Sequence, residues 1–136
     1  MSESPRRTNS GPGRALVAVY GIFALAATAR ATVQLATRYD EAPLAYLLSA
    51  FAAVVYIVAT VTLGRGSRAS RRVAIVAVTT ELIGVLAVGT ASVVHPDAFP
   101  RATVWSIYGI GYGFVPLVLP ILGLIWLWRT RPPRAT

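Results

Sequence analysis

Glu81 is the side chain in this sequence that is best placed to do chemistry, because it is the only carboxylate in an apolar stretch that covers residues 73–94. At a helical rise of about 1.5 Å per residue, Glu81 lies about 12 Å from one end of the stretch and about 20 Å from the other. A stretch of this length can cross the hydrocarbon core of a bilayer, which is about 30 Å thick. An ionisable group at that depth is costly, so we expect Glu81 to face protein groups, a cavity or a neighbouring subunit.

Glu81 has three interpretations. Hydrocarbon surroundings favour the neutral form of a carboxyl group, and a carboxyl that releases and regains a proton, or binds a cation, can couple transport. Alternatively, Glu81 is a packing residue that bonds to a neighbouring helix or pairs with Arg30. The third interpretation is a contact with a partner subunit. We favour the packing interpretation and keep the other two open.

Arg30 and Gln34 are the charged and amide side chains within the first apolar stretch. They lie one helical turn apart and therefore share a face. Arg30 lies about 10 Å from the end of its stretch at Thr37, so its guanidinium can extend outward to the lipid head groups. Its axial offset from Glu81 is also about 10 Å, which the two side chains can only just close, directly or through a water or a threonine hydroxyl. Glu81, Arg30 and Gln34 are the predicted polar residues within the membrane.

A cluster of glycines and prolines interrupts the last apolar stretch. Proline has no backbone N–H, so Pro116 and Pro120 leave the carbonyls of Tyr112 and Pro116 without their usual helical donors. We therefore predict a hinge near the membrane midplane. Broken helices at this depth form ion or substrate sites in transporters, but such clusters more often let helices approach closely, here through Gly109 and Gly113. The predicted hinge residues are Gly109, Gly111, Tyr112, Gly113, Pro116 and Pro120.

Other motifs do not meet the requirements of a known site. The segment Ile110-Gly111-Tyr112-Gly113 resembles part of the potassium-channel filter Thr-Val-Gly-Tyr-Gly, but a pore helix before it and a full inner helix after it are missing. His95 and Asp97, in one turn, are too few ligands for a metal. The sequence has no cysteine and one histidine, which leaves no thiolate chemistry and no nucleophile–base arrangement. We predict a protein that is not an enzyme and has no metal or cofactor.

Composition places the chain among membrane proteins. Hydrophobic residues make up 55% of the 136 residues, and the mean hydropathy is +0.61, above the usual range of soluble domains. The formal net charge of +8 comes from arginine, since lysine is absent. Because the arginines lie at the ends of apolar stretches, we expect them to contact anionic lipid head groups and not nucleic acid.

The apolar stretches predict an all-α bundle of four transmembrane helices. We expect helices at about residues 15–37, 43–63, 73–94 and 104–128, within a transmembrane domain of residues 14–129. The polar segment 1–13 cannot bury apolar area, so we expect it to be disordered. Residues 130–136 form a short tail. A secretory signal cleaved near Ala29-Arg30-Ala31 is the rival interpretation of the first stretch, but the helical pattern continues past that point and favours a retained helix.

Arginine placement predicts the orientation. Arginines are concentrated before the first stretch, between the second and third, and after the fourth. Cytoplasmic segments are enriched in basic residues, so both termini are expected in the cytoplasm, with the protein in the cell membrane. Trp105 and Trp126 would lie about 32 Å apart on a continuous helix, at the two interfaces. The residues expected to contact anionic head groups are Arg65, Arg68, Arg71 and Arg72.

Two family resemblances bear on function. The chain resembles small multidrug-resistance transporters in outline, with four stretches and one membrane glutamate. It departs from them because their glutamate lies in the first span and their charge bias is weak. It is more similar, over about residues 15–131, to small integral membrane proteins of actinobacteria. The features that carry this likeness are Tyr112-Gly113-Phe114-Val115-Pro116 and Trp126-Leu127-Trp128-Arg129, and the likeness implies no known activity.

Function is therefore expected to lie in packing and association. The leading hypothesis is an accessory or structural subunit, or a homo-oligomer, that packs through small-residue helix faces. The alternative is a small proton- or cation-coupled transporter or channel that uses Glu81 and the broken fourth helix. A membrane enzyme is disfavoured, because no nucleophile, metal cluster or base constellation is present.

Overall fold

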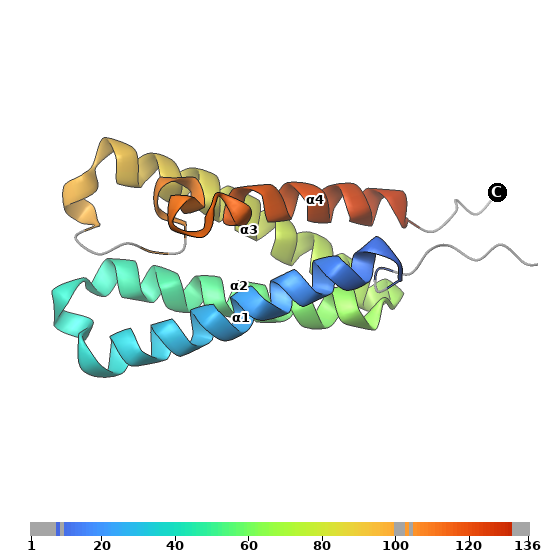
Figure 1. The fold of residues 1–136 in the computed structure, drawn as a ribbon, viewed down its shortest axis with the longest axis horizontal. Helices are drawn as coiled ribbons and strands as arrows, with labels where there is room; N and C mark the ends of the chain where they lie inside the picture. The colour runs from blue at the N-terminus through green and yellow to red at the C-terminus, as the bar shows by residue number, and fades with distance from the viewer. Residues whose placement is uncertain (1–7, 9, 100–102, 104, 132–136) are drawn as a thin grey trace, which may run out of the picture.

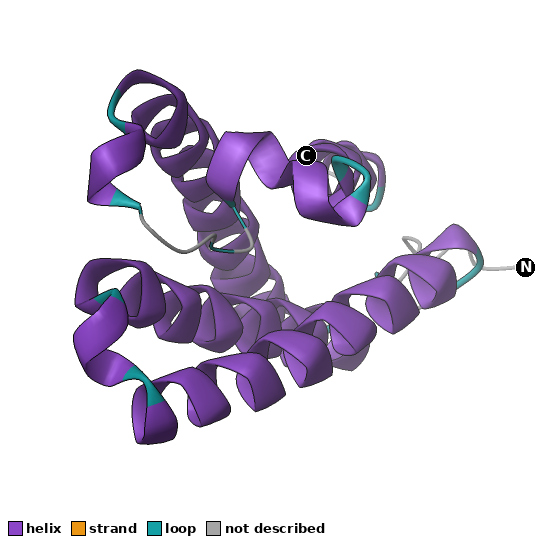
Figure 2. Ribbon diagram, turned by 60° about the vertical axis from the view of Figure 1, so that its left-hand side comes forward, coloured by secondary structure: helices purple, strands orange, loops and turns teal. Residues whose placement is uncertain are grey.

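A computed structural model of the protein describes residues 8, 10–99, 103 and 105–131. The fold of these residues is helical and contains no strand, which confirms the predicted all-α class. Figure 2 shows helices joined by short loops through most of the described chain. The α-helices are α1 (Pro12–Thr37), α2 (Pro43–Arg65), α3 (Arg68–Val94) and α4 (Val115–Arg129), and the 3₁₀ helices are η1 (Tyr39–Glu41), η2 (Pro96–Ala98) and η3 (Ser106–Tyr112).

Helix boundaries follow local capping chemistry. Both α1 and α2 begin at a proline, whose missing N–H is not needed in the first helical turn. Gly66 ends α2 in the left-handed conformation at φ 69°, and the side chain of Ser67 caps α3 by accepting a hydrogen bond from the Ser70 amide at 3.1 Å. The arginine-rich loop that the sequence suggested between about residues 63 and 73 is therefore only a tight turn at Gly66 and Ser67.

Within the described chain, three helices are long and apolar enough to cross a membrane: α1, α2 and α3. The expected fourth helix over residues 104–128 is different. The helices η3 and α4 meet at an angle of 99°, so together they form either a broken span or a re-entrant segment. Helix α4 has 15 residues, about 22 Å of helix, which is less than the thickness of the hydrocarbon core.

The helices run antiparallel to their chain neighbours, so the start of α1, the α2–α3 turn and the end of α4 lie at one end of the molecule (Figure 1). Hydrogen bonds tie that end together. The Arg71 guanidinium donates to Thr130 Oγ1 at 3.1 Å, the Thr8 hydroxyl donates to the Leu63 carbonyl, and the Trp126 indole N–H donates to the Thr8 carbonyl at 2.9 Å. We call this the arginine end, and the opposite end the outer end.

Thr8 departs from the disorder predicted for residues 1–13, because it is buried with 3% of its surface exposed. The chain folds back on itself here, and Gly13 permits this since a Cβ at that position would collide with the Thr8 carbonyl. The hydrogen bonds of Thr8 then replace water as partners for its polar groups. Residues 1–7 and 9, and residues 132–136 of the predicted tail, lie outside the described residues.

Side-chain sizes are arranged as expected for a membrane protein. The interior between the helices holds many alanines, such as Ala52, Ala59 and Ala74, each 0% exposed. Large aliphatic side chains face outward, including Leu25 at 76% and Val76 at 65% exposure. Small residues allow close helix approach, and an apolar exterior is favourable in lipid but not in water.

Candidate functional site

Glu81 is completely buried, with 0% of its surface exposed. Its Oε1 accepts a hydrogen bond of 2.6 Å from the hydroxyl of Tyr20, which is also 0% exposed. Tyr20 belongs to α1 and Glu81 to α3, so the bond joins two helices that are not neighbours in sequence. The carboxyl that the sequence singled out is therefore held by a tyrosine.

Tyr56 of α2 lies beside this pair. Its ring centroid is 6.1 Å from that of Tyr20, and its hydroxyl interacts electrostatically with the Glu81 carboxyl. The same hydroxyl accepts a hydrogen bond of 3.1 Å from the indole N–H of Trp105. A tyrosine oxygen that accepts one bond keeps its own hydrogen for another acceptor, and the carboxyl is the buried acceptor that this hydrogen can serve.

Together these four residues form what we call the Glu81 network. Each comes from a different part of the chain: α1, α2, α3 and the segment before η3. The full set is Tyr20, Tyr56, Glu81 and Trp105. Glu81 Oε2 is buried and makes no hydrogen bond within the described residues. One carboxyl oxygen is thus bonded to Tyr20, and the Tyr56 hydroxyl also interacts with the carboxyl group.

Trp105 can pack against α3 and reach the network because the α3 residue that its ring contacts is a glycine, Gly84. A Cβ on Gly84 would lie 2.6 Å from the Trp105 ring, closer than any real contact allows. Gly84 is one turn from Glu81, about 4.5 Å along the helix axis, so the indole packs against the turn of α3 that follows Glu81. Gly89 receives Tyr108 in the same way. Trp105 is only 1% exposed, so its ring packs inside the protein, and the bend between η3 and α4 removes the continuous helix on which it was predicted to lie.

The segment that carries Trp105 contains a left-handed turn. Ile107 has φ 49°, Tyr108 has φ 58° and Gly109 has φ 83°. Such angles are unfavourable for a β-branched residue, by roughly 1–2 kcal/mol. Hydrogen bonds to α3 hold the turn: the Ile107 amide donates to Ser92 Oγ at 2.8 Å, and the hydroxyls of Tyr108 and Thr90 lie 2.8 Å apart.

Four of the predicted hinge residues, Gly109, Gly111, Tyr112 and Gly113, lie at the break before α4, but the cause of the break differs from the one expected. Gly113 and Phe114 are left-handed, with φ 63° and 62°, and they redirect the chain. Pro116 falls in the first turn of α4, where its missing N–H is not needed. Pro120 lies beyond the first turn, in the interior of α4, where it removes the usual donor for the Pro116 carbonyl.

The expected helix–helix contact through the hinge glycines is also corrected. A Cβ on Gly109 would meet the ring of Pro116 at 2.7 Å, so Gly109 packs against its own segment and not against another helix. A Cβ added at Gly111 or at Gly113 would meet no atom within 4 Å. Glycine is therefore needed at Gly113 for its backbone angle and at Gly109 for both its angle and its packing.

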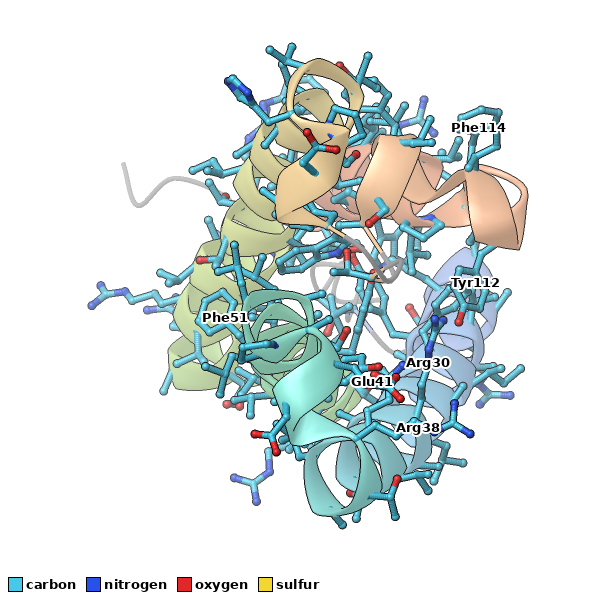
Figure 3. The ribbon with its side chains drawn as sticks, turned by 90° about the vertical axis from the view of Figure 1, so that its left-hand side faces the viewer. Arg30, Arg38, Glu41, Phe51, Tyr112 and Phe114 are labelled. Atoms are coloured by element: carbon cyan, nitrogen blue, oxygen red, sulfur yellow. The ribbon has the colours of Figure 1, made fainter. Side chains whose placement is uncertain are left out.

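Arg30 lies in a second polar cluster, toward the outer end. Its Nη1 donates to the hydroxyl of Tyr112 at 2.7 Å, and Figure 3 shows the two side chains pointing toward one another. The partner of Glu81 is thus Tyr20, and the predicted pairing of Arg30 with Glu81 is not what the structure has. A small cavity of about 10 Å³ lies between Arg30, Tyr112 and Ser49, and the Ser49 hydroxyl has no hydrogen-bond partner in the described part of the chain.

Gln34 is partly buried one turn beyond Arg30, and its side-chain oxygen makes no hydrogen bond to any described residue. Phe23 separates this outer cluster from the Glu81 network. Its ring centroid lies 5.7 Å from that of Tyr56 and 5.6 Å from that of Tyr112. The three candidate polar residues of the sequence therefore fall into two groups on either side of one aromatic ring.

No family model, curated protein or solved structure matches this chain. Its function must accordingly be inferred from its own residues. Metal binding gains no support from them: among the described residues there is no group of three or more histidine, cysteine, aspartate or glutamate side chains that could hold an ion. His95 and Asp97 are both exposed in and beside η2.

Sequence reasoning missed three members of the network: Tyr20, Tyr56 and Trp105. A signal for the tyrosines was present, because both lie well inside apolar stretches and not at their ends. A phenolic hydroxyl in hydrocarbon needs a hydrogen-bond partner, just as a carboxyl does. Trp105 had no such signal, since its position at the start of an apolar stretch is equally typical of an interfacial tryptophan.

Proposed function

We propose that this chain is a small integral membrane protein without catalytic activity, which acts as an accessory or structural subunit or as a homo-oligomer. The observation that carries the proposal is the buried hydrogen bond between Tyr20 and Glu81 at 2.6 Å. A carboxyl in hydrocarbon is stabilised by such donors. Glu81 then holds α1 and α3 in one arrangement, and the protein offers a rigid apolar exterior to its neighbours.

The proposal includes four crossings of the cell membrane with both termini in the cytoplasm. It is supported by the position of Thr8 and Thr130, which are both bonded at the arginine end. An even number of crossings brings the two ends of a chain to the same side. Basic residues at that end favour the cytoplasm and contact anionic head groups. The arginines concerned are Arg65, Arg68, Arg71 and Arg72, with Arg129 and Arg131.

The face proposed for association is the shallow groove between α1 and α2. It has a volume of about 540 Å³ and is lined by residues that include Ala18, Gly21, Thr28 and Thr60. Small residues let a partner helix approach closely in lipid. A side chain that fills the groove should therefore block association without disturbing the Glu81 network, which lies on other faces of these helices.

The test is purification in mild detergent after chemical cross-linking in the native membrane. We expect a stoichiometric partner or a defined oligomer, which Gly21→Leu should reduce at least tenfold. The matched control is Ala87→Leu, which adds similar bulk on an exposed position of α3. A monomer that carries no partner before and after cross-linking would contradict the proposal.

A second candidate function is proton- or cation-coupled transport. It is favoured by Glu81 Oε2, which is buried and makes no hydrogen bond to the described residues. The left-handed turn at Ile107 and Tyr108 supplies a segment that could move, and Phe23 would be the barrier between the outer cluster and Glu81. Ion or substrate passage would require the ring of Phe23 and the indole of Trp105 to shift.

Flux measurements in proteoliposomes distinguish the two functions. If Glu81 couples protons, a pH gradient should drive flux that Glu81→Gln abolishes, because an amide cannot release a proton, while Glu81→Asp retains part of it. If the role is structural, wild type and both variants should give the same background flux. Circular dichroism and elution volume confirm that each variant is folded.

A further inference from the structure

A second groove lies between the first half of α1 and helix α4, with a volume of about 520 Å³. Its floor is formed by Leu16, Leu119 and Trp126, which are buried, and its walls include Val118 and Leu122, which are exposed. The volume falls within the range of roughly 300–1,000 Å³ that is typical of small-ligand sites. Apolar side chains line the groove except at one end.

That end carries Arg129, the only ionisable residue of the lining. Neighbouring arginines at the end of the molecule are engaged elsewhere: Arg71 donates to Thr130, and Arg131 donates to the Trp128 carbonyl. The Arg129 side chain is exposed and makes no hydrogen bond or ion pair with the described residues. The Trp126 N–H is already bonded to Thr8, so among the lining residues Arg129 is the side-chain donor available to a ligand.

The length of the groove matches one leaflet of a bilayer. Its lining on α4 runs from Val115 to Arg129, about 21 Å of helix, and on α1 from Pro12 to Val19, about 10 Å. Half of the hydrocarbon core is about 15 Å thick, and one leaflet with its headgroup region is about 20–22 Å thick. The groove thus starts at the arginine end and stops near the midplane, as the acyl chain of a lipid in one leaflet does.

We infer that this groove binds one acyl chain of an anionic phospholipid, with the headgroup phosphate against the Arg129 guanidinium. The inference rests on the proposed membrane location and deepens it, since it assigns a specific lipid site. A guanidinium pairs with phosphate through charge-assisted hydrogen bonds. A second copy of the chain fits the groove less well, because it would bring another Arg129 and Arg14 to the same end and repel the first.

The experiment is native mass spectrometry of the detergent-solubilised protein with added phosphatidylglycerol or phosphatidylcholine of matched acyl chains. For the wild-type protein we expect phosphatidylglycerol to bind about tenfold more tightly than phosphatidylcholine. Arg129→Gln should remove that preference, with a loss of about tenfold in phosphatidylglycerol affinity, as the loss of one charge-assisted hydrogen bond predicts. Ala15→Phe, which fills the groove, should reduce the binding of both lipids.

The control is Arg38→Gln, which removes an exposed arginine that lies outside the groove and is not among the arginines assigned to the head groups. This variant should bind phosphatidylglycerol with an affinity within twofold of the wild-type value. Equal binding of both lipids to the wild type, or an unchanged preference in Arg129→Gln, would overturn the inference. So would a cross-linked dimer through cysteine at Leu122, which shows that a second copy occupies the groove.

Vesicle flotation separates this outcome from a failure of the proposed function. A chain that does not float with vesicles contradicts the membrane proposal itself. A chain that floats but shows no phosphatidylglycerol preference contradicts only the lipid site. If Ala15→Phe does not fold, the comparison of Arg129→Gln with Arg38→Gln still decides the question, because both change only exposed side chains.

Discussion

The indole N–H of Trp105 donates to the hydroxyl of Tyr56 at 3.1 Å, although 49 residues separate the two in the chain. This bond brings the segment after α3 into the core, next to Gly84. It also completes a network in which a buried carboxyl is surrounded by hydroxyl groups and an indole. The stability of the fold should therefore depend on small polar contacts deep in an apolar protein.

The first prediction concerns the bond between Tyr20 and Glu81. Glu81→Gln keeps the shape and one acceptor oxygen, so the free energy of unfolding should fall by only about 1 kcal/mol. Glu81→Leu leaves the Tyr20 hydroxyl unsatisfied and should cost about 2–3 kcal/mol. The measurement is equilibrium unfolding in mixed micelles.

A double-mutant cycle supplies the control for this pair. Tyr20→Phe alone leaves Glu81 Oε1 without its donor, but Tyr20→Phe combined with Glu81→Leu removes both partners. The combined loss should therefore be smaller than the sum of the single losses. Strict additivity would show that the two side chains do not interact in the folded protein.

The second prediction concerns the glycine that receives Trp105. Gly84→Ala places a methyl group 2.6 Å from the Trp105 ring, so the ring must move. We expect the free energy of unfolding to fall by about 1–3 kcal/mol. Gly21→Ala is the matched control, since its Cβ would meet only a Thr60 methyl at 3.6 Å. Trp105 fluorescence alone is not diagnostic because other tryptophans are present, so unfolding free energies should be compared. Equal effects of the two variants would contradict the placement of the indole.

The third prediction separates backbone conformation from packing at the break before α4. A Cβ meets no atom within 4 Å at either Gly111 or Gly113, but only Gly113 has a positive φ, of 63°. Gly113→Ala should therefore cost about 1–2 kcal/mol through backbone strain. Gly111→Ala should be neutral or stabilise the protein by up to about 1 kcal/mol. Thermal unfolding of the two variants side by side tests this, and a harmless Gly113→Ala would argue against the left-handed break.

The fourth prediction concerns the proposed topology. The chain has no cysteine, so single introduced cysteines report on their own location. Ala69→Cys should react with impermeant maleimide only from the cytoplasmic side, and Ala98→Cys only from outside. Ala69 is preferable to Ser67 because Ser67 caps α3 and its loss would cost about 1 kcal/mol. Labelling of both positions from the same side would contradict an odd number of crossings between them.

The sequence predicted the central residue of the candidate site but not its partners. Helical rise and hydropathy predicted that Glu81 lies near the middle of an apolar helix and needs a partner. They could not name Tyr20 as that partner, because the choice depends on which helices pack together and on their axial register. Arg30 was a reasonable candidate by axial distance, but it bonds to Tyr112 on the far side of the Phe23 ring.

Local chemistry along the chain determined three long apolar helices, since hydrophobicity and capping residues act within a few turns. The course of residues 105–114 was decided by tertiary structure. Gly84 and Gly89 leave room on α3 for Trp105 and Tyr108, and bonds to Ser92 and Tyr56 hold the segment in angles that its own residues disfavour. A sequence pattern reports local preference, whereas the packed core supplies the contacts that outweigh it.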